Sequence, residues 1–249
     1  LGPGKEYLVV SRLARLLPSF GLRGFGDLAD RLADFAAARL RTAVVDAMTT
    51  NETFWFRDHG HFRTLIEGIV STHRSSDLRI WSAAASTGQE AYTAAICLQD
   101  ALQEGRLDRS LRYQITGTDI SPSALEQARR GVYCGIGASR GLSDQQRRRY
   151  FREREGCIEL LPQYREGVAF HEFNLLKPFD VLGRFDVVFC RNVLIYFSQD
   201  RRRDIVTRIA RAMKPGGHLF LGSTESMRGH EDLFEMRHLG GALVYRVRC

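Results

Sequence analysis

Apolar side chains recur every three to four positions through residues 5–48, and this spacing predicts amphipathic helices. In KEYLVVSRLARLL the leucines and valines fall on one side of a helix, which Pro18 and Gly21 end. FGDLADRLADFAAARL follows with the same rhythm. We predict a small all-α domain over residues 1–48 and, after an irregular linker at 49–58, another helix from about Asp58 to His73.

Short apolar runs alternate with helical segments after residue 78. LRIWSA, LRYQITGTD, RFDVVFC, HLFLGS and ALVYRV have the length and composition of buried strands. One intervening helix, SPSALEQARRG, is fully delimited, with Ser121 as N-cap, Pro122 in the first turn and Gly131 past its end. Strands that alternate with helices of about 10–15 residues predict an α/β fold with a mainly parallel, doubly wound sheet.

One segment, residues 132–176, interrupts this alternation. SDQQRRRYF predicts a short helix, and CIELLPQY and EGVAFHEF are interpreted as two antiparallel strands joined at Arg165, Glu166 and Gly167. We interpret the segment as an antiparallel β-subdomain, inserted at about residues 150–173 into a domain that spans residues 59–249.

The chain is basic: 36 lysines and arginines against 29 acidic residues give a net charge of +7. This charge favours acidic partners, such as nucleic acid, anionic lipid or an acidic protein surface. Arg147–Arg149 and Arg201–Arg203 resemble nucleic-acid-binding runs. However, consecutive residues of a helix point in different directions, and no aromatic residues interleave with these arginines. Solvated helix faces explain the runs better.

The five cysteines show no CxxC pair and no regular spacing, which argues against zinc and against a disulfide framework. His59 and His61 have no further ligands nearby, so we predict no metal site. There is no run of about 18 apolar residues that would span a membrane, and the first residues lack the apolar core of a signal peptide. A reducing cytoplasm therefore fits this sequence best.

Small and polar residues follow the predicted strands, at the edge where an open α/β sheet binds its ligands. After the first strand, residues 82–88 are all small, which allows close approach of a ligand but also serves tight helix packing. Asp119 ends the second strand, where a carboxylate suits ribose hydroxyls or caps the following turn. Asn174 follows the inserted segment, and Arg191 and Asn192 follow the third strand. The dinucleotide and P-loop fingerprints are absent.

Six motifs, taken in order, resemble the CheR family of chemotaxis-receptor glutamate methyltransferases, which use S-adenosylmethionine. They are TTNETFWFR, IWSAAASTGQEAYTAAI, GTDISPSALEQARRGVY, FNLLKPF, FDVVFCRNVLIYF and KPGGHLFLGSTES. The motifs extend over nearly the whole chain. The resemblance implies a Rossmann-like S-adenosylmethionine-dependent methyltransferase sheet with a small N-terminal all-α domain for receptor docking, here shorter than is usual in the family.

The resemblance also implies the site. In the family the linker after the helical domain lies over the cofactor, with its aromatic residues sealing the lid and Arg57 facing the methionyl carboxylate. Asp119 would take the ribose hydroxyls, and Asn174 and Leu175 would border the adenine. The candidate cofactor-binding residues are Asn51, Thr53, Arg57, Ala84, Gln89, Glu90, Asp119, Asn174, Leu175, Arg191 and Asn192. Our own hypothesis for the catalytic residues nearest the transferred methyl group is Tyr196 and Arg191.

One departure concerns the cofactor's ammonium group. The family usually has GEE where this chain has Gly88, Gln89 and Glu90. If the first acid holds the ammonium, Gln89 keeps an acceptor but lacks the charge. Charged hydrogen bonds contribute about 1.5–3 kcal/mol and neutral ones about 1 kcal/mol, so cofactor binding is expected to be weaker unless Glu90 substitutes.

The implied reaction methylates a glutamate carboxylate on a chemoreceptor's cytoplasmic helix and releases S-adenosylhomocysteine. Acidic receptor helices would suit the basic charge, with Arg12 and Arg15 as docking candidates. In some members the inserted subdomain binds a receptor's C-terminal pentapeptide, which the sequence leaves open here. Two alternatives also stay open: a catalytically silent module that binds the cofactor, supported by Gln89, and a nucleic-acid methyltransferase, against which RNVLIYF lacks the prolines of a flipped-base pocket.

Overall fold

The computed structural model describes residues 4, 6–34 and 36–248. The N-terminal lobe is helical, as predicted, and buries Leu13, Leu28 and Leu40 in a core of its own. The first helix ends earlier than expected, and Pro18 lies inside a single-turn helix, where its missing N–H is not needed. The helices of the lobe are α1 (Glu6–Leu13), α2 (Leu16–Ser19), α3 (Phe25–Ala33) and α4 (Ala38–Met48).

A seven-stranded sheet in the order β6-β2-β1-β7-β8-β10-β9 forms the centre of the larger domain. Neighbours from β6 to β8 are parallel, and β10 is antiparallel to both β8 and β9. This confirms the predicted doubly wound α/β sheet. Its strands are β1 (Asp77–Ala83), β2 (Arg112–Asp119), β6 (Val168–Glu172), β7 (Phe185–Cys190), β8 (Met213–Leu221), β9 (Phe234–Leu239) and β10 (Ala242–Val247).

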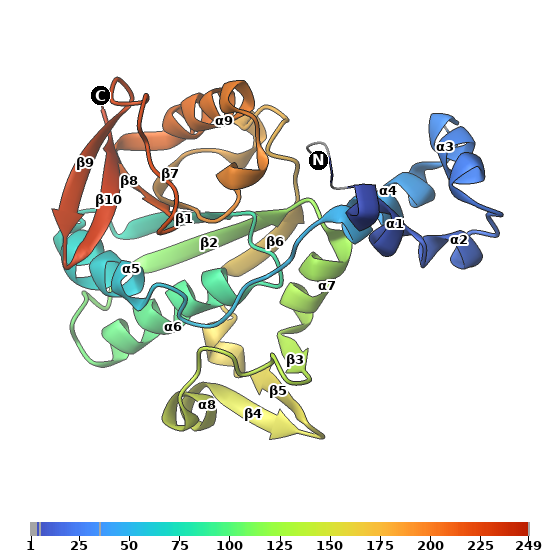
Figure 1. Ribbon diagram of the computed structural model, residues 1–249. Coiled ribbons are helices and arrows are strands. Elements are labelled where there is room, and N and C mark those ends of the chain that lie inside the picture. Colours follow the sequence, from blue (N-terminus) through green and yellow to red (C-terminus); the bar gives the residue numbers. More distant parts are fainter. Residues whose placement is uncertain (1–3, 5, 35, 249) are drawn as a thin grey trace.

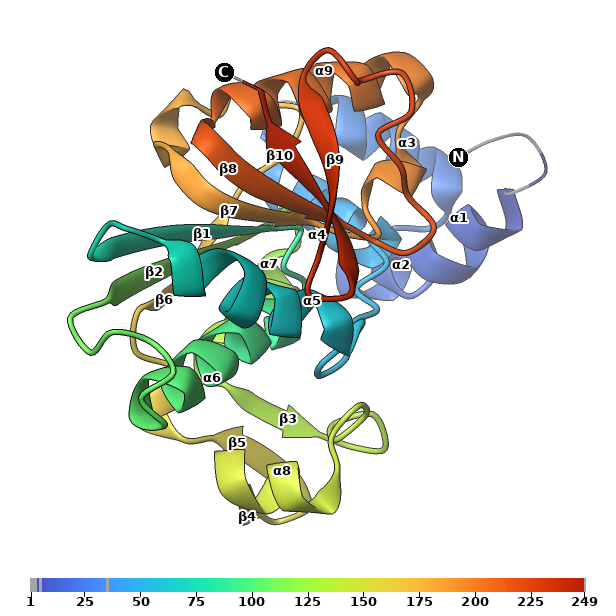
Figure 2. The same ribbon diagram turned by 90° about the vertical axis from the view of Figure 1, so that its left-hand side faces the viewer.

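Successive residues of the central strands serve opposite faces of the sheet. Ile80 and Val187 belong to one apolar core, and their neighbours Trp81 and Val188 belong to the other. Helices α5 and α6 cover one face and α9 covers the other (Figure 2). These helices and their continuations are α5 (His59–Thr64), a π-helical turn Leu65–Ile69, a 3-10 turn Val70–Thr72, α6 (Gln89–Gln103), α7 (Pro122–Arg130) and α9 (Gln199–Arg211).

The sequence signals for helix ends are followed in α7 and not in α9. Helix α7 has the predicted limits, because the Ser121 hydroxyl accepts from the amide of Ala124 and Gly131 closes the helix with φ 65°. Helix α9 ends at Arg211, four residues before Pro215, which lies within β8 and does not mark the end of the helix. None of the described helices is long and apolar enough for a membrane span.

The inserted β-subdomain differs from the prediction. Strand β6, in EGVAFHEF, pairs in parallel with β2 as an edge of the main sheet and does not form a hairpin with CIELLPQY. The subdomain is instead a three-stranded antiparallel sheet in the order β3-β5-β4, and it projects away from the main sheet (Figure 1). Its elements are β3 (Val132–Cys134), α8 (Asp144–Tyr150), β4 (Phe151–Arg154) and β5 (Cys157–Leu160).

Two cysteines of this subdomain form a disulfide bond, which corrects the sequence interpretation of the cysteines. Cys134 and Cys157 lie opposite each other on β3 and β5, with 4.2 Å between their Cα atoms. Their separation of 23 residues gives no local signal, because only the antiparallel register brings them together.

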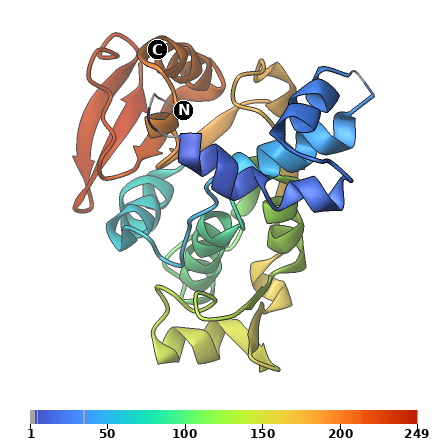
Figure 3. The same ribbon diagram turned by 45° about the vertical axis from the view of Figure 1, so that its right-hand side comes forward.

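The N-terminal lobe lies beyond the end of the sheet where β2 passes into α7 (Figures 1 and 3). Asp46 on α4 accepts hydrogen bonds from the hydroxyls of Ser121 and Ser123 at the start of α7. The Arg12 guanidinium donates to the carbonyl of Met48 at 2.7 Å. The bonds of Asp46 hold the lobe against the edge where the carboxyl ends of the parallel strands meet, and the bond of Arg12 joins α1 to α4 within the lobe.

Candidate functional site

A cavity of about 630 Å³ lies at this edge, between the N-terminal lobe and the carboxyl ends of β1, β2 and β7. We call residues 49–57, which cross above these strand ends, the roof segment. The cavity is lined by Met48, Thr49, Thr50, Asn51, Glu52, Thr53, Phe54, Arg57, Phe62, Ala84, Ala85, Ser86, Glu90, Asp119, Ile120, Arg191, Asn192, Val193, Ile195, Tyr196, Phe197 and Ser198.

The backbone around the cavity is unusually constrained. Ala84, Ser86 and Asn192 line it with φ values of 62°, 51° and 57°. Phe56 and Asp58, in and just after the roof segment, have φ values of 53° and 55°. Left-handed conformations of non-glycine residues cost about 1–3 kcal/mol each and cluster at ligand-binding and active sites. Their grouping here marks the cavity as the functional site.

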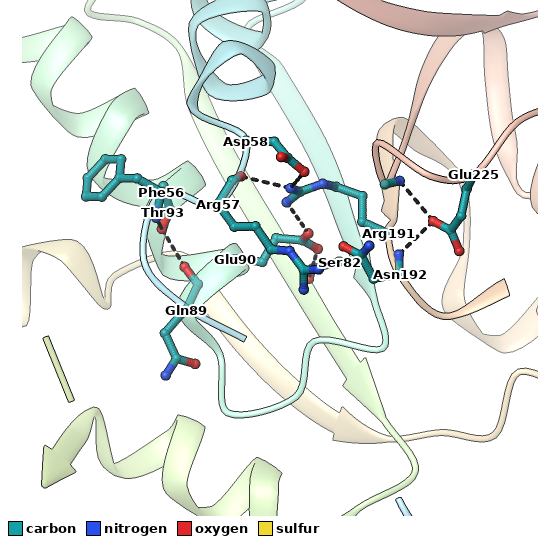
Figure 4. A network of polar contacts seen from close by, with 11 residues as sticks. Phe56, Arg57, Asp58, Ser82, Gln89, Glu90, Thr93, Arg191, Asn192 and Glu225 are labelled. Atoms are coloured by element: carbon teal, nitrogen blue, oxygen red, sulfur yellow. Dashed lines mark hydrogen bonds and ion pairs between the residues drawn. The ribbon is translucent and has the colours of Figure 1, made fainter. Parts of the chain in front are cut away.

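The aromatic residues of the roof segment anchor it rather than seal it, which corrects the expected lid. Trp55 is 1% exposed. It packs edge-on against Tyr133 and Phe151, with ring centroids 5.0 and 4.8 Å away. Phe56 also points away from the cavity (Figure 4). Of the three aromatic residues only Phe54 lines the cavity, so the other two fasten the segment to the β-subdomain and α6.

Asn51 joins the roof to the floor of the cavity. Its carbonyl accepts from the Ser86 hydroxyl at 3.0 Å, and its side-chain amide donates to the Ser121 hydroxyl at 3.0 Å. Thr53 and Arg57, two further predicted residues, also line the cavity. The Arg57 guanidinium lies 5.4 Å from the centre of the Phe54 ring.

Asp119 is a buried carboxylate at the end of β2. One oxygen accepts from the amide of Ser86 at 2.8 Å and the other from the amide of Ser121 at 2.9 Å. Burial raises its pKa, and the backbone hydrogen bonds oppose that shift. Each oxygen retains a lone pair, so Asp119 both shapes the floor and offers acceptors to hydroxyl groups in the cavity.

Arg191 is the centre of a charged network (Figure 4). Its side chain is 2% exposed and forms ion pairs with Glu90 at 2.8 Å and Asp58 at 2.5 Å. It also donates to the carbonyl of Arg57 at 2.8 Å. Glu90 completes the network by accepting from the Ser82 hydroxyl at 2.7 Å. Arg191 therefore ties β7 to the roof segment and to α6.

Glu225, which was not among the predicted site residues, organises the loop that follows β7. Oε2 accepts from the amides of Asn192 at 2.6 Å and Gly222 at 2.9 Å. Oε1 accepts from the amides of Val193 at 3.1 Å and Leu194 at 2.9 Å. One carboxylate thus fixes the left-handed Asn192 and the start of the turn that carries Tyr196. Its only sequence signal is its place in the GSTES motif.

Gln89 is not among the residues that line the cavity, and its contact with a cofactor stays a prediction. Its side chain is buried and accepts from the Thr87 hydroxyl at 2.7 Å. In Figure 4 it points away from Arg191, whereas the neighbouring Glu90 points toward it. Successive helical residues differ in direction by about 100°, so only one of these two adjacent residues faces the cavity. Glu90 is that residue.

Asn174 and Leu175 are likewise not among the cavity-lining residues. The Asn174 side chain accepts from the amide of Leu176 at 2.8 Å and stabilises its own turn. Leu175 is 7% exposed and belongs to the core on the α9 side of the sheet. Their contact with a ligand stays a prediction.

The remaining predicted residues come together. Asn51, Thr53, Arg57, Ala84, Glu90, Asp119, Arg191, Asn192 and Tyr196 all line the cavity. Its volume is in the range of small-ligand sites, about 300–1,000 Å³. Asp119 offers acceptors for hydroxyl donors, Glu90 offers a negative charge, and the small residues 84–86 allow close approach. Together with Arg57 and Arg191, these groups fit a small polar ligand that carries hydroxyl groups and charges of both signs.

Residues 51–241 match the family model described as "CheR methyltransferase, SAM binding domain". Chemotaxis protein methyltransferase Cher2 of Pseudomonas putida is 40% identical over 253 residues, which cover 100% of this chain and 92% of that protein. The chemotaxis protein methyltransferase of Escherichia coli is 37% identical over 252 residues, covering 99% and 85%. The chain therefore belongs to the CheR methyltransferase family and contains its S-adenosylmethionine-binding domain.

Proposed function

We propose that this protein methylates glutamate side chains on the cytoplasmic helices of chemotaxis receptors. The observation that carries the proposal is the full-length similarity to chemotaxis protein methyltransferases, combined with a cavity that opens beside Tyr196. When bound, S-adenosylmethionine supplies an activated methyl group. The protein would then act in the cytoplasm, where its receptor substrates present these helices.

The cavity residues supply three binding contacts for the cofactor. Asp119 accepts from the ribose hydroxyls, because it lines the cavity and each of its carboxylate oxygens keeps a lone pair beyond its one amide bond. Glu90 offsets the charge of the ammonium group in place of Gln89, and Arg57 pairs with the methionyl carboxylate, for which guanidinium geometry is suited. Glu90, which lines the cavity, supplies the carboxylate that Gln89 lacks, and this supports an active enzyme over a catalytically silent module.

The reaction requires no general base. A glutamate carboxylate has a pKa of about 4.3 and is ionised at neutral pH. The described residues that line the cavity include no histidine, and Glu90 and Asp119 are engaged in hydrogen bonds. Catalysis then depends on holding the acceptor in line with the methyl group, for which effective molarity supplies about 7–11 kcal/mol, and on excluding water from the acceptor.

The acidic receptor helix would dock across the N-terminal lobe. Arg12 also has a structural role, because its guanidinium donates to the carbonyl of Met48 and the hydroxyl of Thr50. Arg15, Arg31 and Arg39 are exposed and remain candidates. In the β-subdomain, β4 is an edge strand, the geometry that strand addition by a receptor's C-terminal pentapeptide needs.

The proposal is tested by incubating receptor-bearing membranes with the protein and S-adenosylmethionine labelled in its methyl group. We expect label on the receptor that mild base releases as methanol, and no label on a receptor whose acceptor glutamates are replaced by alanine. Base-stable label would indicate N-methylation or nucleic-acid methylation instead. Uptake of the cofactor without any labelling would indicate a silent module.

Replacing Tyr196 by phenylalanine should lower turnover and leave cofactor affinity nearly unchanged. Tyr196 is 63% exposed and lines the mouth of the cavity, so its hydroxyl can meet an incoming carboxylate. Loss of one hydrogen bond of about 1 kcal/mol corresponds to a roughly fivefold fall in turnover. Initial rates at saturating cofactor measure this, and an unchanged rate would remove Tyr196 from the catalytic role.

A further inference from the structure

The disulfide between Cys134 and Cys157 lies one residue away from the packing that supports the cavity. The ring of Tyr133 packs edge-on against Trp55 of the roof segment, with centroids 5.0 Å apart. Its hydroxyl donates to the carbonyl of Thr87, in the loop that forms the cavity floor, at 2.8 Å. Tyr133 thus contacts both the roof segment and the loop beneath the cavity, while its neighbour Cys134 is covalently bound to Cys157 on β5.

The loop that follows Cys134, residues 135–142, holds the roof segment from outside. The Trp55 indole donates to the carbonyl of Ala138 at 2.9 Å, and the Trp55 amide donates to the carbonyl of Arg140 at 3.1 Å. Arg140 also pairs with Glu52 at 2.8 Å. Its guanidinium lies 4.5 Å from the centre of the Phe54 ring. Glu52 and Phe54 line the cavity, so this loop touches cavity-lining residues directly.

The loop of residues 135–142 packs closely against the roof segment at Gly141. Gly141 has φ 90°, and a Cβ atom added there would lie 2.0 Å from the carbonyl oxygen of Trp55. Small displacements of residues 135–142 are therefore transmitted to Trp55. The beginning of the loop is fixed by the disulfide, since β3 is a three-residue edge strand of its sheet.

We propose that Cys134 and Cys157 are a thiol–disulfide modification site, and that its redox state sets how firmly the roof segment closes over S-adenosylmethionine. With the disulfide formed, β3 and the start of the loop are held at β5. With the thiols reduced, only the backbone pairing of three residues holds them, and short edge elements open locally at low cost. The inference rests on cofactor binding in the cavity and is independent of the methyl acceptor.

The co-reactant is a low-molecular-weight disulfide. Cys134 is exposed, so its thiolate can attack one sulfur of that disulfide, forming a mixed disulfide and releasing one small thiolate. The Cys157 thiolate then attacks Cys134 Sγ and releases the second. The protein loses two electrons and its two thiol protons, and the small disulfide gains both as two thiols.

The test compares oxidised and reduced protein in the binding of S-adenosylhomocysteine, with the thiol state verified by mass spectrometry of the intact chain. We expect reduction to accelerate dissociation of the ligand by about fivefold, the scale of a local opening equilibrium rather than of unfolding. Amide exchange of residues 52–57 should increase in parallel. Cys134→Ser/Cys157→Ser should bind as the reduced protein does, whatever the redox buffer.

The matched control is Cys97→Ser, which removes a thiol on α6 that is not part of the pair and should keep the redox response. Equal dissociation rates for the verified oxidised and reduced proteins would overturn the proposal. The disulfide would then only stabilise the β-subdomain. If a low-molecular-weight disulfide did not oxidise Cys134 and Cys157, the proposal would also be overturned. If neither the oxidised nor the reduced protein binds S-adenosylhomocysteine, the proposed cofactor site is wrong.

Discussion

Replacing Arg191 by methionine is expected to lower the free energy of unfolding by about 3–5 kcal/mol, the usual effect of removing one partner from a buried ion pair. The side chain is 2% exposed, and its partner Glu90 is 12% exposed. Without the guanidinium, Glu90 keeps only the Ser82 hydroxyl as a donor, while Asp58, at 33%, can turn toward solvent. Methyl transfer should be lost as well, because the roof segment is no longer tied to β7.

Urea denaturation followed by circular dichroism measures the first effect. Arg191→Met/Glu90→Gln should recover part of the stability, because the second change removes the unpaired charge, but it should not recover activity. Arg148→Met, on the exposed side of α8, is the matched control and should leave both quantities near wild type. An Arg191→Met protein with wild-type stability would contradict the proposed role of the network.

Replacing Glu225 by glutamine is expected to reduce turnover by about a hundredfold, the scale associated with small displacements of positioning groups. Each carboxylate oxygen accepts two backbone amides, so either orientation of the glutamine places an NH₂ group against two N–H donors. The loop from Asn192 to Leu194 must then shift, and Tyr196 moves with it. Leaving such donors unsatisfied costs about 1–3 kcal/mol each.

The pattern of kinetic change separates positioning from general destabilisation. Turnover of Glu225→Gln should fall at temperatures where the variant is fully folded, with a smaller change in cofactor affinity. Glu231→Gln is a suitable control, since Glu231 is exposed and accepts one backbone amide, that of Gly229. Wild-type turnover of Glu225→Gln would show that the four hydrogen bonds are not needed for catalysis.

Much of the fold was predictable because its signals are local. Helix α7 carries its cap, its proline and its closing glycine within eleven residues, and the structure uses all three. Asp119 and Arg191 were found because the carboxyl ends of parallel strands meet at one edge of a sheet. The same rule placed Asn192 there. These inferences needed only the order of the strands.

The missed features depend on contacts that the local sequence does not encode. A five-residue strand such as β6 reads alike in parallel and antiparallel pairing, and its neighbour is β2 rather than the strand before it. The roof segment has no regular periodicity, so the sequence does not show that Trp55 points away from the cavity and packs against the β-subdomain. The binding of four amides by Glu225 requires two loops to meet, and the Cys134–Cys157 bond requires the register of β3 and β5.

The most direct test of the central claim is isothermal titration of the folded protein with S-adenosylhomocysteine, combined with amide exchange in the presence of the ligand. We predict one molecule bound per chain, with protection concentrated in residues 49–57, 84–88 and 191–196. Folded protein that takes up no ligand, or that binds it while these three segments stay unprotected, would contradict it.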